Sequence, residues 1–283
     1  MKMCEALGRS QSSYYDYVNG NTYTPSAERE ELSKKVKEIF DFHKKRYGAA
    51  RILEDMLEQG CKIGLYKVRS LMKEQGLKAI QPKRFVPKTT QTHPNLRRSP
   101  NLLLDKNNLP TEPNQVIVGD ITYLPCQISG YIYHVYLAVW MDLFSRKIVG
   151  WYVDEHMETS LVISAFQMVL KNRNPEAGFI VHSDGGGQYG SIEFREILAA
   201  NNFRQSMTRK DNHYDNAHIE SLFGRFKTEV LDGGLFTGIE DATFRSFEYI
   251  EAYYNPIRRH SALGQISPDI FEKRFWRNYD FDL

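Results

Sequence analysis

The chain has 283 residues, which is long enough for one sizeable core and a smaller satellite domain. Its composition is that of an ordinary globular protein, and a net charge of +2 says little until its distribution along the chain is considered. The cysteines Cys4, Cys61 and Cys126 have neither CxxC nor Cys/His spacing, which argues against a zinc site or a disulfide framework and favours reduced thiols. Because no apolar signal segment or membrane-spanning run occurs, we expect a cytoplasmic protein without a membrane partner.

Residues 1–25 form an N-terminal arm that contains the segment CEALGRSQSSYYDYV. This segment is consistent with the second half of a small helical unit, and equally with a frayed terminal helix. Both interpretations stay open from the sequence.

Residues 26–80 have the pattern of three helices, which predicts an all-α domain. Ser26 can cap the first helix, and Gly60 and Gly76 can end the second and third. Apolar residues recur at helical spacing in each of them: Leu32, Val36, Ile39 and Phe40; Ile52, Leu53, Met56 and Leu57; Leu65, Val68, Leu71 and Met72.

The third of these helices also carries basic residues, Lys67, Arg69 and Lys73. Two short helices joined by a tight turn, with cations on the second, are typical of a helix-turn-helix with a recognition helix. We therefore favour DNA binding through these three side chains. The alternative is a helical hairpin with a solvated basic face.

Residues 81–114 are predicted to be a linker, because they contain six prolines and show no apolar periodicity. Lys83 and Arg84 are among the cations that precede the first acidic residue, Asp105. A basic tether beside a DNA-binding domain is suited to lying along phosphates, with Lys83 and Arg84 as contacts. A plain solubilising spacer is the alternative.

From residue 115 onwards, strands alternate with helices, which indicates an α/β domain. Three strand-like runs joined by short turns predict an antiparallel meander. The later elements are predicted at residues 161–169, 178–182, 192–200, 203–206 and 219–230, with a tail of further helices from 242 and from 267. This order is that of a ribonuclease H-like catalytic domain over residues 115–283, with a mixed five-stranded sheet and flanking helices.

Three acidic residues stand out within this domain. Asp120 interrupts an apolar strand, and a buried strand does not accept a lone carboxylate without a partner or a metal. Asp184 directly follows a short strand and precedes three glycines, so that a bulky ligand can approach there. Glu220 lies on a helix, half sheltered beside the apolar face, with Lys227 two turns on and Gly224 between them. Taken alone, a helix carboxylate is more often solvated than a metal ligand.

The chain resembles the catalytic, OrfB-type transposases of IS3-family insertion sequences, within the DDE transposase and retroviral integrase superfamily. Asp184 and Glu220 are separated by thirty-five residues, which matches the D…D-(35)-E spacing of that superfamily. The resemblance covers nearly the whole chain and rests on these runs: RYGAARI, LMKEQGLKA, GDITYL, DLFSRKIVGW, HSDGGGQY, QSMTRKDNHYDNAHIES and YNPIRRHSALGQISP. The sequence departs from the family pattern at three places: Gly185 stands where an arginine is usual, Ile117 and Val118 occupy a region where a tryptophan is usual, and Tyr214 stands where another tryptophan is usual.

This resemblance implies a metal-dependent enzyme that cleaves DNA 3′ ends and transfers the strands. Two Mg²⁺ ions, for which Mn²⁺ can substitute, would serve an in-line displacement in such a site. On this hypothesis Asp120 contacts both ions, and Asp184 and Glu220 each complete one site. The resemblance also implies insertion-sequence ends and target DNA as partners, a homo-oligomer on paired ends, a nucleoid association and, in some cases, an upstream OrfA-type protein or fusion.

Five further residues are candidate DNA contacts: Lys227, Arg225, Gln188, Tyr189 and Asn216. Lys227 could instead be a surface lysine, and Gln188, Tyr189 and Asn216 could pack or support the site, which is the interpretation we favour for these three. His182 is interpreted as a core histidine and Asp142 as a turn former. The segment Arg258-Arg259-His260 is interpreted as a solvated basic tail unless it contacts phosphate.

Other functions compete with transposition. A hydrolytic nuclease on the same fold would cleave without joining, and a DNA-binding protein with a decayed catalytic domain would do neither. A tyrosine recombinase would need Tyr254 as a nucleophile among Arg258, Arg259 and His260, which the tail-helix pattern does not favour. The intact set of three carboxylates argues against the decayed protein.

Overall fold

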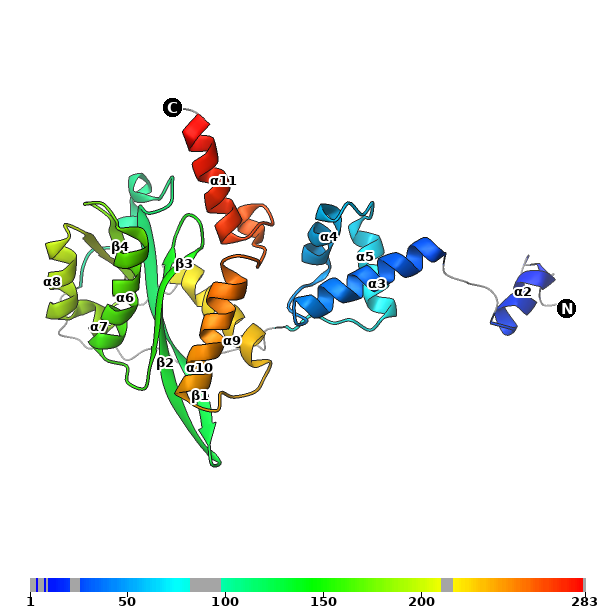
Figure 1. The fold of residues 1–283 in the computed structure, drawn as a ribbon, viewed down its shortest axis with the longest axis horizontal. Coiled ribbons are helices and arrows are strands. Elements are labelled where there is room, and N and C mark those ends of the chain that lie inside the picture. Colours follow the sequence, from blue (N-terminus) through cyan, green and yellow to red (C-terminus); the bar gives the residue numbers. More distant parts are fainter. Residues whose placement is uncertain are drawn as a thin grey trace. The chain divides into compact units, whose positions relative to one another are not determined.

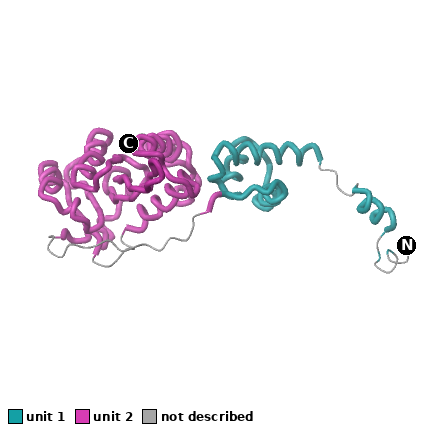
Figure 2. Tube along the Cα trace, turned by 90° about the horizontal axis from the view of Figure 1, so that it is seen from below, with its two compact units in different colours: residues 1–79 teal, residues 80–283 magenta. Residues whose placement is uncertain are grey.

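The computed structural model describes residues 4, 8, 10–20, 26–81, 98–209 and 216–281, the last three of these without side chains. The chain divides into two compact units, Met1–Ala79 and Ile80–Leu283 (Figure 2). Lys83, Arg84 and Tyr214 lie outside the described residues. Within the described ranges no helix is both long and apolar enough to cross a lipid bilayer.

The first unit is helical. Its helices are α2 (Gln11–Val18), α3 (Ala27–Phe42), α4 (Ala49–Glu58) and α5 (Leu65–Glu74). Helices α3, α4 and α5 pack against one another, whereas α2 buries none of its residues. The apolar stripes predicted for 26–80 form the core of this bundle, with Val36, Ile52 and Val68 fully buried. Leu57 was expected in the core but is exposed, because it lies in the last turn of α4.

The second unit is built on a five-stranded sheet. Its strands are β1 (Val116–Ile128), β2 (Tyr131–Asp142), β3 (Ile148–Asp154), β4 (Ile180–Ser183) and β5 (Arg204–Met207). They lie in the order β3-β2-β1-β4-β5. The first three are antiparallel, as the short turns predicted, and β1, β4 and β5 are parallel. The sheet is therefore mixed, with β1 at its centre.

Helices cover both faces of this sheet (Figure 1). They are α6 (Thr159–Arg173), α7 (Gly187–Gly190), α8 (Ile192–Ala200), α9 (Ala217–Leu231), α10 (Ile239–Tyr249), which continues as a π-helical turn (Ile250–Tyr254), and α11 (Pro268–Phe281). Helices α6, α7 and α8 pack together on one side, and α9 and α10 pack on the other. Short 3-10 turns occur at Leu102–Leu104, Lys106–Asn108 and Ser261–Leu263.

The larger core lies between the sheet and α6 to α8. It contains Ile117 and Trp140 from the strands and Phe166, Phe194 and Leu198 from the helices. Because side chains alternate along a strand, residues at every second position of β1 face this core and the others face α9. This alternation places Ile117 and Ile121 on one side and Asp120 on the other.

Three stretches add to the prediction. Residues 187–190, for which no element was predicted, form the short helix α7, and the tail helix predicted from 267 is α11, which is fourteen residues long. Part of the predicted linker is packed on the sheet edge, since the amide of Leu102 donates to Ser206 Oγ at 2.9 Å. The segment from residue 98 thus belongs to the second unit.

Candidate active site

The strand register brings Asp120 and Asp184 together. In the parallel pairing of β1 with β4, Gly119 lies opposite Ser183, so the next residue of each chain segment is Asp120 or Asp184. Asp184 is just beyond the carboxyl end of β4, where its Oδ1 accepts from the amide of Gly186 at 2.9 Å. Asp120 Oδ1 accepts from the amide of Ile121 at 2.8 Å. Two carboxylates distant in sequence therefore meet at the centre of the sheet.

Helix α9 places Glu220 and Lys227 near this pair. The helix packs against β1, and at its start Asn216 Nδ2 donates to the carbonyl of Gly119 at 3.4 Å. Its predicted apolar face is buried, including Ile219 and Phe226. Glu220 is exposed rather than half sheltered, because it lies outside the buried face of α9.

The charged groups of the site influence one another's ionisation. Burial raises the pKa of Asp120 well above its ordinary value, and Asp184 and Glu220 raise it further, while Lys227 lowers it. Burial also raises the pKa of Asp184, opposed by the amide of Gly186 and by the charge of Arg98. Burial lowers the pKa of Lys227, and Asp120 opposes that shift. Ionising both Asp120 and Asp184 is thus unfavourable without a compensating cation.

The donor set fits a hard cation such as Mg²⁺, because it consists of carboxylate oxygens. Mg²⁺ commonly takes only one or two protein carboxylates and fills its other positions with water and phosphate oxygens. Asp120 and Asp184 provide such a pair. Among the described residues, no three His, Cys, Asp or Glu side chains are already gathered as a metal cluster, so Glu220 is not part of a preformed cage.

Comparisons with known proteins place this chain in a family. Family models of the integrase core domain match residues 110–213 and 201–268, and a model of an HTH-like domain matches residues 27–85. The transposase for insertion sequence element IS904 of Lactococcus lactis is 39% identical over 87% of this chain and 95% of that protein. Transposase InsF for insertion sequence IS3A of Escherichia coli is 36% identical over 96% and 93%.

This chain belongs to the IS3 family of insertion-sequence transposases. A 31 kDa protein of insertion element IS600 from Shigella sonnei is a further relative, 37% identical over 96% of this chain and 98% of its own length. Among solved structures, the HTLV-2 integrase catalytic core domain in complex with magnesium shares 20% identity, with a TM-score of 0.41 over 55% of this chain and 95% of that one. The prediction of a ribonuclease H-like α/β domain behind a helix-turn-helix domain is confirmed.

Two predicted DNA contacts of this transposase need correction. Tyr189 is only 2% exposed, because its ring packs edge-on against Trp140 and Phe194 in the core. Asn216 is buried at the start of α9, on the carbonyl of Gly119. Neither side chain is available to DNA in this structure. Gln188 is half-buried, and its amide donates to the carbonyl of Met157 at 2.9 Å.

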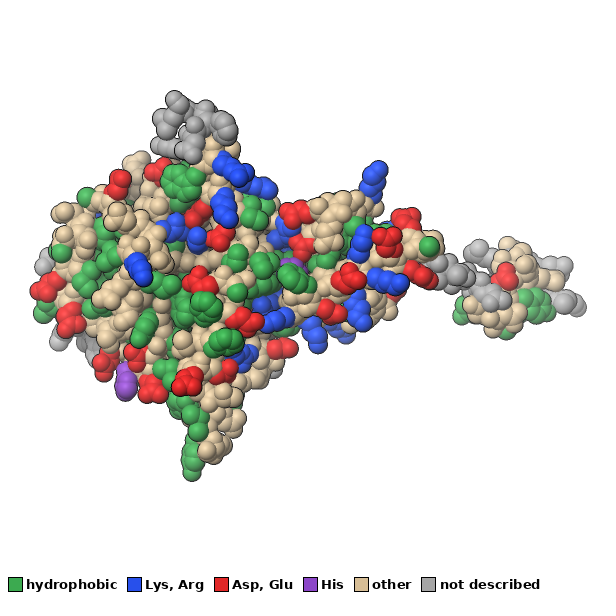
Figure 3. Space-filling view, in the orientation of Figure 1, with side chains coloured by type: hydrophobic (Ala, Val, Ile, Leu, Met, Phe, Trp, Pro, Cys, Tyr) green, Lys and Arg blue, Asp and Glu red, His purple; other side chains and the backbone are tan. Residues whose placement is uncertain are grey.

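Three of the other predicted contacts lie at the surface, whereas Lys227 is half-buried. Arg225 is exposed on α9, and Arg69 and Lys73 are exposed on α5. Lys67 forms an ion pair with Glu28 of α3 at 3.3 Å, so part of its charge is already neutralised. On the visible face of the helical unit, basic side chains are interspersed with acidic ones (Figure 3). The described part of this domain therefore shows no continuous basic patch on that face.

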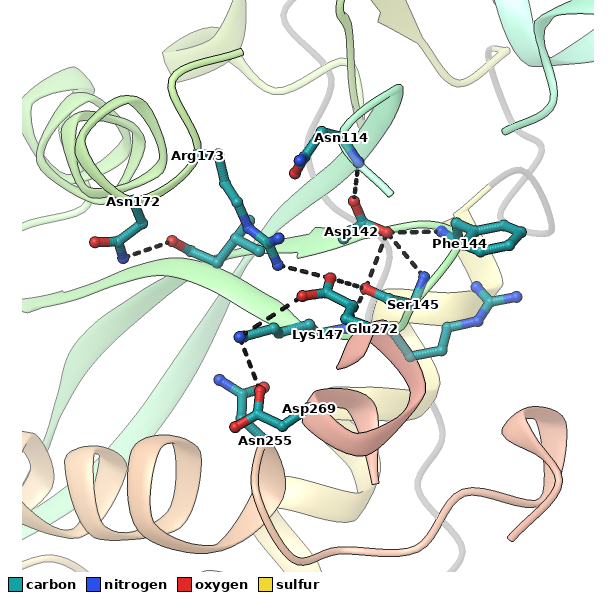
Figure 4. A network of polar contacts seen from close by, with 12 residues as sticks. Asn114, Asp142, Phe144, Ser145, Lys147, Asn172, Arg173, Asn255, Asp269 and Glu272 are labelled. Carbon is teal, nitrogen blue, oxygen red and sulfur yellow. Dashed lines mark hydrogen bonds and ion pairs between the residues drawn. The ribbon is translucent and has the colours of Figure 1, made fainter. Parts of the chain in front are cut away.

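Asp142 and His182 have the structural roles that the sequence indicated. Asp142 Oδ1 accepts from the amide of Ser145 at 2.8 Å, which closes the turn between β2 and β3. Figure 4 shows that this turn connects to the tail: Ser145 Oγ donates to Glu272 of α11 at 2.6 Å, and Arg173 of α6 donates to the same carboxylate at 2.8 Å. His182 is buried, and its Nδ1 forms a hydrogen bond with Ser206 Oγ at 2.8 Å.

The predicted solvated basic tail is wrong. Arg258 is 2% exposed, and its guanidinium donates to both carboxylate oxygens of Glu229 on α9, at 2.9 and 2.5 Å. Arg259 is also buried and donates to the carbonyl of Gln265. Tyr254 is buried, and its hydroxyl donates a hydrogen bond to the carbonyl of Arg146. These groups hold the tail on the catalytic unit, which removes the basis for a tyrosine recombinase.

One residue near the carboxylates is not among the candidate site residues that the sequence indicated. Arg98 belongs to the predicted linker of residues 81–114, yet its guanidinium lies beside Gly185, the residue after Asp184. The signal that could have indicated this was the glycine itself, which leaves room where the family usually has a side chain.

Proposed function

We propose that this chain is a DDE transposase that cleaves the 3′ ends of its insertion sequence and transfers them to target DNA. The observation that carries the proposal is the meeting of Asp120 with Asp184 at the centre of the sheet, within electrostatic reach of Glu220. The membership of the IS3 family supports the same reaction class.

In this proposal Asp120, Asp184 and Glu220 hold Mg²⁺, with two ions in the working site and Mn²⁺ as a substitute. When bound, the ions supply activation of a water or DNA 3′-OH nucleophile and stabilisation of the leaving oxygen. The three carboxylates themselves fix where cations can lie, because each is carried by a different element of one folded core. Their mutual repulsion also makes the site selective for positive charge.

Other residues would bind and orient the DNA. Lys227, half-buried near Asp120, is placed to bind a phosphate beside the reacting one, and Arg225 and Gln188 can contribute further contacts. Lys67, Arg69 and Lys73 of the helix-turn-helix unit, with Lys83 and Arg84 of the tether, would hold flanking duplex. We further propose a homo-oligomer on paired ends, associated with the nucleoid, with an OrfA-type protein or fusion as a partner.

The test is incubation of the full chain with labelled insertion-sequence ends and Mg²⁺. We expect 3′-end cleavage and joined products, and loss of both by roughly a thousandfold or more in Asp120→Asn, Asp184→Asn or Glu220→Gln, because bound cations supply several kcal/mol of transition-state stabilisation. Glu193→Gln, which changes an exposed carboxylate on α8, is the matched control and should retain activity.

The outcomes separate the competing functions. Cleavage without joined products would favour a hydrolytic nuclease. DNA binding without either product would favour a decayed transposase. Unchanged activity in the three carboxylate variants would refute the proposed site.

A further inference from the structure

The segment that begins at Arg98 is fixed to the edge of the sheet beside the candidate site. Three hydrogen bonds join it to β5: Ser99 Oγ to Gln205 Oε1 at 2.6 Å, the Met207 amide to the Pro100 carbonyl at 3.3 Å, and the Leu102 amide to Ser206 Oγ at 2.9 Å. Residue 98 is therefore held near the carboxyl ends of β4 and β5. The carboxyl end of β4 is also where Asp184 lies.

The guanidinium of Arg98 fills the space that a side chain at position 185 would take. A Cβ atom on Gly185 would overlap Nη2 and Cζ of Arg98 and would lie 2.8 Å from its Nε. The backbone of Gly185 is not in the left-handed region, so alanine would fit its conformation, and the three atoms nearest to its added Cβ all belong to Arg98. The guanidinium of Arg98 and a side chain at position 185 would therefore occupy the same space.

This guanidinium keeps donor capacity that the described part of the chain does not use. Nη1 of Arg98 is buried and has no hydrogen-bond partner there, and no ion pair joins Arg98 to a described carboxylate. A sheltered guanidinium with an unused donor is unfavourable unless an anion completes its hydrogen bonds. Arginine presents a planar fork of donors that matches the oxygens of a phosphate group.

We propose that Arg98 is a DNA-binding residue of the active site that holds a backbone phosphate beside Asp184, and that glycine at position 185 is required to admit its side chain. This inference rests on the proposed function, since it takes DNA as the anion that reaches Asp184. It also means that a residue of the predicted linker of residues 81–114 takes part in the site.

A double-mutant cycle in the full chain tests the proposal. We expect Arg98→Gln to slow 3′-end cleavage by about ten- to a hundredfold, the loss typical of one charged hydrogen bond. Gly185→Ala should cause a similar loss because the new methyl group displaces the guanidinium. In the Arg98→Gln background, Gly185→Ala should add no further loss. Arg204→Gln, an exposed arginine on β5 paired with Asn108, is the control and should cleave at the parental rate.

A second measurement separates phosphate binding from support of Asp184. Single methylphosphonate substitutions along the DNA remove one phosphate charge at a time. We expect a methylphosphonate at one position near the cleavage site to slow cleavage by the parent chain but not cleavage by Arg98→Gln. Thermal melting of each variant without DNA should match that of the parent, which shows that folding is intact.

Several results would overturn the inference. Cleavage by Arg98→Gln at the parental rate would do so. The same loss of rate from Gly185→Ala in the parent and in the Arg98→Gln background would also do so. A third such result is a methylphosphonate scan in which no position slows the parent chain more than it slows Arg98→Gln. If the parent chain does not cleave, the proposed function fails separately. The same cycle and scan, measured as affinity for end DNA in EDTA, then still decide whether Arg98 binds a phosphate.

Discussion

At the scale of the residue, Asp120 is a half-buried acidic side chain whose desolvation opposes folding when the carboxylate is ionised. It lies on the central strand between Gly119 and Ile121, beside Asp184, and within reach of the charge of Glu220. Burial and repulsion both favour its protonated form, whereas a divalent cation would favour the ionised form. The unfavourable electrostatic energy of such a site can be relieved when a cation binds.

This leads to a prediction about stability and pH. The pKa of Asp120 is raised in the folded chain above the ordinary value of 3.8, so ionisation destabilises the folded state as pH rises from that ordinary value towards the raised pKa. In EDTA at neutral pH, Asp120→Asn should therefore be more stable than the parent, by about 1.4 kcal/mol for each pH unit by which the pKa is raised. The difference should shrink as pH falls towards the ordinary value. Chemical denaturation at a series of pH values measures it.

Asp232→Asn is a suitable control, because Asp232 is exposed in a left-handed cap that asparagine also accepts. A parent chain that is more stable than Asp120→Asn in EDTA at neutral pH would contradict the prediction. So would a difference that widens on acidification.

At the scale of the element, strand β1 can lie close to β2 because Gly119 has no side chain that would overlap Trp140. Gly119 is paired with Trp140 of β2, and a Cβ at position 119 would overlap the indole ring. That ring is packed between Phe166 and Phe194, with centroid separations of 5.4 and 5.8 Å. The absence of a side chain at 119 thus sets the spacing of β1 and β2 one residue before Asp120.

We therefore predict that Gly119→Ala destabilises the chain by about 1–3 kcal/mol, the usual cost of overpacking a close-packed core. The matched control is Gly224→Ala on α9, where no atom lies within 4 Å of the added Cβ. Alanine there should stabilise the chain by about 0.5–1 kcal/mol through its helix propensity. Urea denaturation monitored by circular dichroism measures both changes, and a neutral Gly119→Ala would show that the indole can move aside.

The tail helices are tied to the catalytic unit by buried polar contacts. Asn255 exchanges two hydrogen bonds with the backbone of Ile148 on β3, and Arg258 forms its ion pair with Glu229 on α9. Removing one partner of a buried pair leaves the other charge buried without compensation. The positions of α9 and therefore of Glu220 thus depend on residues far along the chain.

At the scale of the whole molecule, the two compact units are joined by a chain segment whose charge is one-sided. Residues 82–97 include Lys83, Arg84, Lys88 and Arg97 and contain no acidic residue. The net charge of +2 conceals this concentration because acidic residues elsewhere balance it. A basic tether between a DNA-binding unit and a catalytic unit is expected to follow the phosphates between their two sites.

We predict that the combined variant Lys83→Gln, Arg84→Gln and Lys88→Gln binds end DNA with a weaker dependence on salt. The slope of log affinity against log salt concentration should become less negative by about 0.9 for each phosphate that the variant no longer neutralises. Fluorescence anisotropy over a salt series measures the slope. Lys171→Gln with Lys273→Gln and Arg274→Gln, three exposed cations of the catalytic unit, is the control. An unaltered slope would make the tether a spacer.

The sequence by itself determined the elements and the identity of the acidic residues. Apolar periodicity is local, so the buried faces of α6 and α9 and the mixed character of the sheet could be predicted from spacing. Asp120 was recognisable because a carboxylate within an apolar strand is anomalous wherever the strand lies. Asp184 was recognisable because it follows a strand and precedes glycines.

Only the tertiary structure decided which polar residues are covered. Tyr189 turned out to be a core residue, Arg258 a buried ion-pair partner and Arg98 a neighbour of Gly185, whereas Glu220 turned out to be exposed. The physical reason is that the burial of a polar side chain depends on the distant element that packs over it. The residues next to the side chain in sequence do not indicate which distant element packs over it.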